Sequence, residues 1–99
     1  MVDSILIVED DANVRESLLS VLASKYSAVE SVSDGEQALK AIEREDYDVL
    51  LLDLQLPKVS GMEVLAHARK LSPDTSIVIL TAHGSIENAV EAMKLGADD

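Results

Sequence analysis

The chain has no cysteine, no tryptophan and no phenylalanine among its 99 residues. The lack of cysteine excludes disulfides, thiolate metal sites and cysteine nucleophiles, and it is typical of a reducing compartment. Tyrosine is the only aromatic residue type and occurs twice, so the core must be aliphatic. With so few aromatic side chains, the protein has no base-stacking platform for single-stranded nucleic acid.

Positive charge is also scarce. Eight Lys and Arg stand against 19 Asp and Glu, which gives a formal net charge of −11. This field repels phosphate backbones, so we expect no direct contact with nucleic acid. Hydrophobic residues make up 47%, too many for a disordered acidic tail. The apolar runs are too short to span a membrane and the start is too acidic for a signal peptide, so we expect a cytoplasmic protein.

Short apolar runs alternate with helical patterns along the chain. The runs at residues 4–8, 49–52 and 77–80 predict buried strands, and the more polar residues 28–32 predict a strand nearer a sheet edge. Apolar residues at helical spacing follow each predicted strand. The first helix has a possible cap at Asp11 or Asn13, and the next two begin at capping boxes in residues 33–36 and 60–63. The last helix begins after Gly84. This alternation predicts an α/β domain with a parallel sheet and helices on both faces.

Acidic and hydroxyl side chains follow three of the predicted strands. Glu9 and Asp10 follow the first, Asp53 the third and Thr81 the fourth. Ligands of open parallel sheets bind beyond the carboxyl ends of the strands, so neighbouring first and third strands would bring the three acids together. Clustered carboxylates favour a hard cation such as Mg²⁺ among them. For Asp11, next in the chain, we expect a helix cap or a solvated residue.

In their order and spacing these motifs resemble the bacterial response-regulator receiver domain. The resemblance rests on the acid pair in residues 7–11, on residues 53–57 with the capping box at 60–63, and on residues 80–82. It covers residues 1–99 as one receiver domain. It implies a flavodoxin-like (CheY-like) fold, a doubly wound parallel sheet with strand order 2-1-3-4-5.

The resemblance also implies a role for each motif residue. Asp53 would be the phosphoryl acceptor, taking a phosphoryl group from a sensor histidine kinase to form an acyl phosphate. Glu9 and Asp10 would hold Mg²⁺ together with Asp53, and the backbone carbonyl of Gln55 would be a further ligand. Thr81 would be the switch hydroxyl, which moves to hydrogen-bond a phosphoryl oxygen.

Residues 81–97 look most like the receivers of nitrogen-regulatory-type transcriptional activators. The resemblance therefore implies a phosphorelay switch that controls transcription rather than an enzyme. The family's phosphate-binding lysine and its aromatic switch residue would fall after Asp99, so we expect the fifth strand and fifth helix to be absent from this chain. The fourth strand would then be a hydrophobic edge and one side of the first helix would be uncovered, which favours a homodimer or other self-association.

Three other functions compete with this interpretation. A phosphohydrolase of the haloacid-dehalogenase type also uses a nucleophilic aspartate with Mg²⁺, but it needs a second aspartate where this chain has Gln55. A flavin-binding electron carrier needs a phosphate-binding loop after the first strand, where residues 9–11 are acidic instead. A pseudo-receiver that acts by interaction alone is the remaining alternative, and the intact acidic cluster with Thr81 argues against it.

Overall fold

Strands and helices alternate along the chain as the sequence predicts. The computed structural model describes residues 4–54, 56 and 58–80. Its elements in chain order are β1 (Ser4–Val8), α1 (Ala12–Ala23), β2 (Ala28–Val32), α2 (Gly35–Arg44), β3 (Val49–Asp53), α3 (Gly61–Leu71) and β4 (Ser76–Leu80). The helix predicted after Gly84 lies outside the described residues. Within the described ranges, no helix is both long and apolar enough to cross a membrane.

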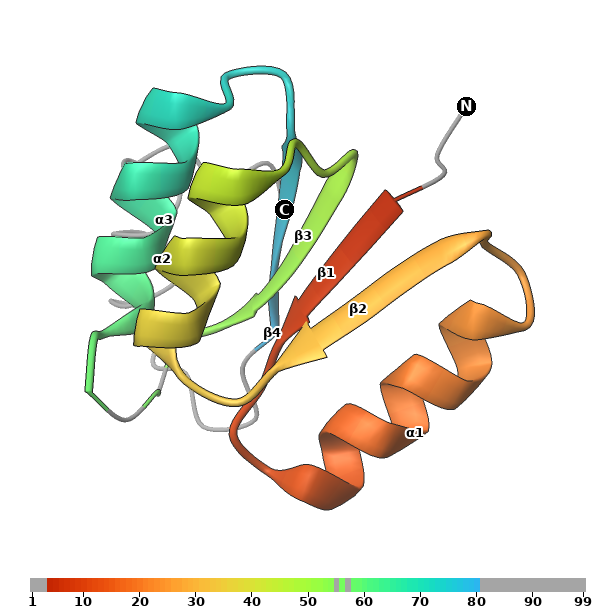
Figure 1. Ribbon diagram of the computed structural model, residues 1–99. Helices are drawn as coiled ribbons and strands as arrows, with labels where there is room; N and C mark the ends of the chain where they lie inside the picture. The colour runs from red at the N-terminus through yellow and green to blue at the C-terminus, as the bar shows by residue number, and fades with distance from the viewer. Residues whose placement is uncertain (1–3, 55, 57, 81–99) are drawn as a thin grey trace.

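The strands form a parallel sheet in the order β2-β1-β3-β4 (Figure 1). This order confirms the predicted flavodoxin-like arrangement of the first four strands. In the pairing of β1 with β3, Val8 lies opposite Leu52. The residues that follow them, Glu9 and Asp53, therefore leave the sheet side by side at its carboxyl edge.

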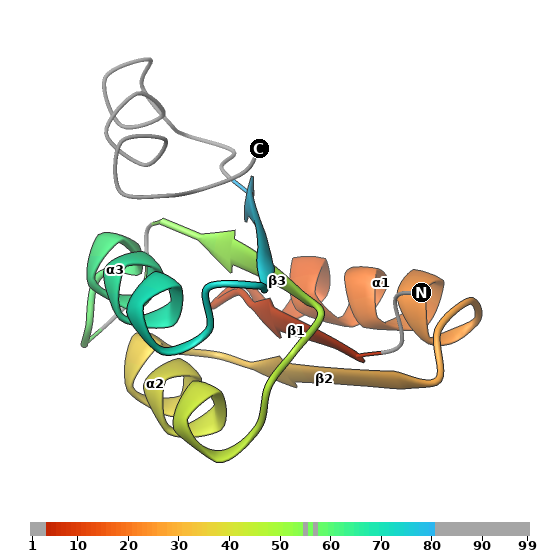
Figure 2. The same ribbon diagram turned by 90° about the horizontal axis from the view of Figure 1, so that it is seen from above.

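Helices cover both faces of this sheet. α2 and α3 lie side by side on one face and α1 lies on the other (Figures 1 and 2). Successive side chains of a strand point to opposite faces, so Leu6, Val8, Leu50 and Leu52 all reach the α2–α3 side, where they are buried in one cluster. The core is aliphatic, as the composition requires, and Tyr47 is its aromatic member.

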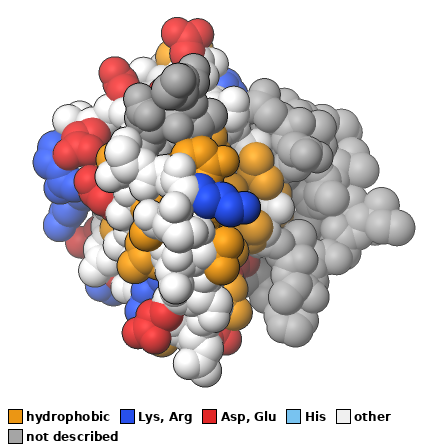
Figure 3. Space-filling model, turned by 90° about the vertical axis from the view of Figure 1, so that its right-hand side faces the viewer, with side chains coloured by type: hydrophobic (Ala, Val, Ile, Leu, Met, Phe, Trp, Pro, Cys, Tyr) orange, Lys and Arg blue, Asp and Glu red, His pale blue; other side chains and the backbone are white. Residues whose placement is uncertain are grey.

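On the opposite face, α1 is covered only in part. The helix contacts β1 and β2, but none of its residues is fully buried. The side chains of Val14 and Val21 are 43% and 59% exposed, although their spacing belongs to the apolar stripe. Figure 3, which views the molecule from the side of α1 and β2, shows hydrophobic side chains at the surface. Part of the apolar stripe of α1 is therefore exposed, and whether a missing fifth helix is the cause stays a prediction.

Side-chain caps begin all three described helices. Asp11 caps α1 by accepting from the backbone N–H groups of Asn13 and Val14, and Ser60 caps α3, as the sequence predicts. For α2 the prediction was wrong by one residue, because Asp34 rather than Ser33 is the cap. Asp34 accepts from the backbone of the third helical residue, while that residue's side chain bonds back to the N–H of Ser33. Gln37 therefore bonds both Asp34 and Ser33, in place of the predicted pairing of residues 33 and 36.

Candidate functional site

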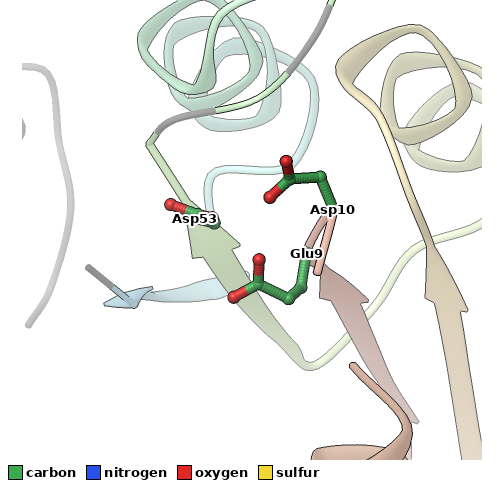
Figure 4. A group of neighbouring side chains, drawn as sticks. All are labelled: Glu9, Asp10 and Asp53. Carbon is green, nitrogen blue, oxygen red and sulfur yellow. The ribbon is translucent and has the colours of Figure 1, made fainter. Parts of the chain in front are cut away.

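Three carboxylates meet at the carboxyl edge of the sheet. Glu9 and Asp10 follow β1, and Asp53 is the last residue of β3. Each of them offers an oxygen atom, and these atoms lie within 4.8 Å of one another. Figure 4 shows the three side chains near one another, with Glu9 and Asp10 at the end of β1 and Asp53 at the end of β3. The convergence follows from the β1–β3 pairing, which joins residues more than forty positions apart in the sequence.

In the carboxylate cluster, the surroundings of Glu9 disfavour its negative charge. Glu9 is only 7% exposed, and burial is the main reason why its pKa rises from the ordinary 4.5 to about 7. The hydrogen bond and the charge repulsion from Asp53 raise this pKa further, whereas the backbone N–H of Asp11, 3.2 Å from Glu9 Oε2, lowers it. The site therefore favours a bound proton or a bound cation.

The donor set determines which cation fits. Within the described residues the cluster consists of carboxylate oxygens alone, which are the ligands of a hard ion such as Mg²⁺. Asp10 is exposed, so the cluster opens to solvent on one side, and a small ion there could keep several of its waters. The residues present therefore fit the predicted magnesium.

Arg15 supports the loop that presents Glu9 and Asp10. From α1 its Nη1 donates to the backbone carbonyl oxygen of Glu9 at 3.0 Å and to that of Asp10 at 3.4 Å. The backbone N–H of Glu9 is itself held by the carbonyl of Val32 at 3.2 Å. Sequence reasoning missed Arg15, although a cation in the first turns of a helix that follows an acid pair is a usable signal.

Gly61 holds the loop after Asp53 close to α3. Its N–H donates to the carbonyl of Leu54 at 3.2 Å. A Cβ at position 61 would lie 2.4 Å from the Cα of Leu54 and 2.6 Å from the carbonyl oxygen of Asp53, so a larger residue would displace the backbone of the site. The sequence marked Gly61 only as part of a capping box, because this close approach depends on the tertiary fold.

Of the five site residues predicted from the sequence, the structure brings three together. Glu9, Asp10 and Asp53 form the cluster, and their chemical roles stay predictions. Gln55 and Thr81 lie outside the described residues.

A cavity of about 320 Å³ lies away from the acidic cluster, at the amino end of β3 and β4. Several of its polar groups already have structural partners. Asp48 accepts hydrogen bonds from the backbone N–H and hydroxyl of Ser4, and the hydroxyl of Thr75 donates to the carbonyl of Tyr47 at 2.6 Å. These contacts join the strand ends, so we assign this cavity no chemistry.

Comparison with known proteins agrees with this fold. The family model of the response regulator receiver domain matches residues 5–99. The chain belongs to this family. The regulatory protein LuxO of Vibrio cholerae is 46% identical over 92 residues, which cover 93% of this chain and 20% of LuxO. The transcriptional regulatory protein DltR of Streptococcus agalactiae is 39% identical over 95 residues, covering 96% of this chain and 42% of DltR.

A solved structure extends the likeness of this receiver domain to three dimensions. The chain superimposes with a TM-score of 0.91 and 32% identity on a response regulator protein from Burkholderia pseudomallei, covering 97% of this chain and 56% of that one. That structure is described as having a phosphorylated aspartic acid, a calcium ion and citrate. The chain spans about a fifth of the length of LuxO. The likeness therefore concerns the receiver domain and not the whole of LuxO.

Proposed function

We propose that this receiver domain accepts a phosphoryl group from a sensor histidine kinase onto Asp53, in a reaction that requires Mg²⁺. The observation that carries the proposal is the convergence of Glu9, Asp10 and Asp53, whose oxygen atoms lie within 4.8 Å of one another. The aspartyl phosphate and calcium ion of the Burkholderia pseudomallei relative support it by analogy.

In the transfer, a carboxylate oxygen of Asp53 attacks the phosphorus atom of a phosphohistidine. An O–P bond forms as the N–P bond breaks, and the electron pair of that bond stays on the imidazole nitrogen. A bound Mg²⁺ would neutralise charge that develops on the phosphoryl oxygens. Glu9, Asp10, Asp53 and the carbonyl of Gln55 are the groups that would hold the ion.

The protonation of Glu9 links cation binding to pH. Its pKa of about 7 leaves part of the population protonated at neutral pH. A carboxyl group must lose its proton to bind a cation well, so Mg²⁺ binding at this site releases protons. The affinity for Mg²⁺ should therefore rise as the pH rises through 7.

The signal then passes from Asp53 to an output. We propose that Thr81 acts as the switch hydroxyl and that residues 1–99 work as one receiver domain. The output we propose is transcription, because the motifs resemble receivers of transcriptional activators and DltR is a transcriptional regulator. In this scheme the domain works in the cytoplasm, contacts neither DNA nor membrane itself, and associates with a second copy through β4.

The phosphorylation proposal has a direct test. The protein is incubated with acetyl phosphate and Mg²⁺, and the modified residue is mapped by mass spectrometry. We expect one phosphoryl group on Asp53, lost in Asp53→Asn or when Mg²⁺ is chelated. Asp11→Asn is the matched control, because asparagine still caps α1 and the variant should be labelled normally.

Two results would contradict the proposal. Labelling that persists in Asp53→Asn would place the acceptor elsewhere. A protein that binds Mg²⁺ at the cluster but takes no label would favour the pseudo-receiver, an interaction module that works without phosphorylation.

A further inference from the structure

Val59, which lies shortly before α3, is pressed against the start of α2. A Cβ at Gly35 would lie 2.1 Å from the carbonyl oxygen of Val59, so the first residue of α2 nearly touches the loop backbone. Val59 also packs against the hydrophobic core. The segment that follows the proposed phosphoryl acceptor therefore has a second support besides α3.

Lys58 adds a charged link at the same place. Its Nζ lies 3.6 Å from Asp34 Oδ2 and 3.9 Å from Glu36 Oε2, both at the start of α2. The side chain of Asp34 is only 9% exposed, and its other oxygen caps the helix by accepting from the N–H of Gln37 at 2.8 Å. The lysine therefore pairs with a carboxylate that is already fixed in place.

The backbone of Lys58 indicates that these contacts constrain the loop. Its φ is 68°, in the left-handed region that non-glycine residues seldom occupy. Such a conformation persists only where the surroundings hold it. Here those surroundings are the close contact of Val59 with Gly35 and the ion pairs to Asp34 and Glu36.

We propose that Lys58 is a positioning residue for the acidic site. Its ion pairs with Asp34 and Glu36 hold residues 58–59 against α2, and in this way they keep Asp53 in place beside Glu9 and Asp10. This inference rests on the proposed function, because it assigns Lys58 a task at the proposed cation site. It makes Mg²⁺ affinity depend on a residue outside the carboxylate cluster.

The sign of the effect distinguishes positioning from simple charge. Removing a positive charge from a protein of net charge −11 should increase its attraction for a cation. Loss of loop positioning should instead weaken binding. If Lys58→Gln weakens Mg²⁺ binding, the change therefore opposes the electrostatic trend.

Lys40 provides a matched control. Its Nζ lies 3.6 Å from Glu36 Oε1, so it pairs with one of the same carboxylates, but the pair lies within α2 and leaves the loop untouched. Both lysines are largely exposed, and both variants should fold. Lys40→Gln thus removes the same charge without changing the support of the loop.

The experiment is a Mg²⁺ titration followed by the backbone amide shifts of Glu9, Asp10 and Asp53. We expect Lys58→Gln to raise the Kd for Mg²⁺ about two- to five-fold, the range expected for loss of its partly exposed ion pairs. Lys40→Gln should leave the Kd unchanged or slightly lower. Lys58→Arg, which keeps the charge, should restore binding.

A second variant tests the partner. Asparagine at position 34 can still cap α2, but it removes the negative charge that Lys58 contacts. We expect Asp34→Asn to weaken Mg²⁺ binding, and the double variant with Lys58→Gln to be no weaker than the more affected single variant. Additive losses would show that the two residues act separately and would overturn the positioning role.

The outcomes separate this inference from the proposed function. If Mg²⁺ shifts the amides of the unaltered protein but binds Lys58→Gln equally or more tightly, the role of Lys58 is wrong and the site stands. If Mg²⁺ leaves the amides of Glu9, Asp10 and Asp53 unmoved in the unaltered protein, the proposed metal site fails, and the role of Lys58 fails with it.

Discussion

Replacing Glu9 with glutamine should stabilise the metal-free protein at alkaline pH. Glu9→Gln keeps the size of the side chain and an oxygen that can accept from the N–H of Asp11, but it removes the buried charge beside Asp53. The pKa of Glu9 is raised by folding, so its carboxyl group opposes folding whenever it is ionised. The glutamine is neutral at every pH and lacks this cost.

The size of the effect follows from linkage. A rise in the pKa of Glu9 from 4.5 to about 7 on folding changes the free energy of unfolding by about 3 kcal/mol, because each unit of pKa difference is worth about 1.4 kcal/mol. Because the native pKa is the higher one, the favourable contribution of Glu9 is complete below pH 4.5 and is lost as the pH rises through 7. The free energy of unfolding of Glu9→Gln should therefore be higher than that of the unaltered protein by about 3 kcal/mol at pH 8. At pH 5 the difference should be less than about 1 kcal/mol.

Urea unfolding followed by circular dichroism, with chelator present, measures this difference at both pH values. Glu16→Gln in α1 is the control, because Glu16 is exposed and its loss should shift the free energy of unfolding by at most about 0.5 kcal/mol at either pH. Added Mg²⁺ should stabilise the unaltered protein more than Glu9→Gln. A variant that is less stable at pH 8, or equally stabilised at pH 5 and pH 8, would refute the reasoning.

Four further changes test other parts of the structure. Asp10→Asn should weaken Mg²⁺ binding in an amide-shift titration, and an unchanged Kd would exclude Asp10 as a ligand. Ser60→Ala should lower the free energy of unfolding by about 1 kcal/mol through loss of the α3 cap, measured in urea; no loss would show that the cap is not needed. Gly35→Ala should destabilise by about 1–3 kcal/mol despite its better helix propensity, because its Cβ would collide with Val59; a stabilised protein would contradict that packing. Leu52→Ala should cost about 2–5 kcal/mol in the same assay, and a loss well below this range would mean that the core refills the space.

Local patterns in the sequence were enough to determine the elements of the fold. The apolar run ending at Val8 and the run ending at Asp53 predicted β1 and β3, because strands buried on both faces need apolar side chains on both. Ser60 was recognisable as a cap and Asp11 as one of two candidates, since spacing from the next helical residues is a local property. The acid pair after β1 and the aspartate at the end of β3 could be named as a candidate site, because ligands of parallel sheets bind beyond the carboxyl ends of the strands.

The tertiary structure alone decided how deeply these features are buried and which distant residues support them. Pairing of β1 with β3 brings Glu9 beside Asp53, and the resulting burial, together with the hydrogen bond and charge of Asp53, raises the pKa of Glu9 to about 7. The links from Arg15 to the β1–α1 loop and from Lys58 to the start of α2 join residues whose contact depends on how the helices pack. A sequence pattern specifies which face of an element is apolar, whereas burial and long-range contacts depend on what the folded chain places against that face.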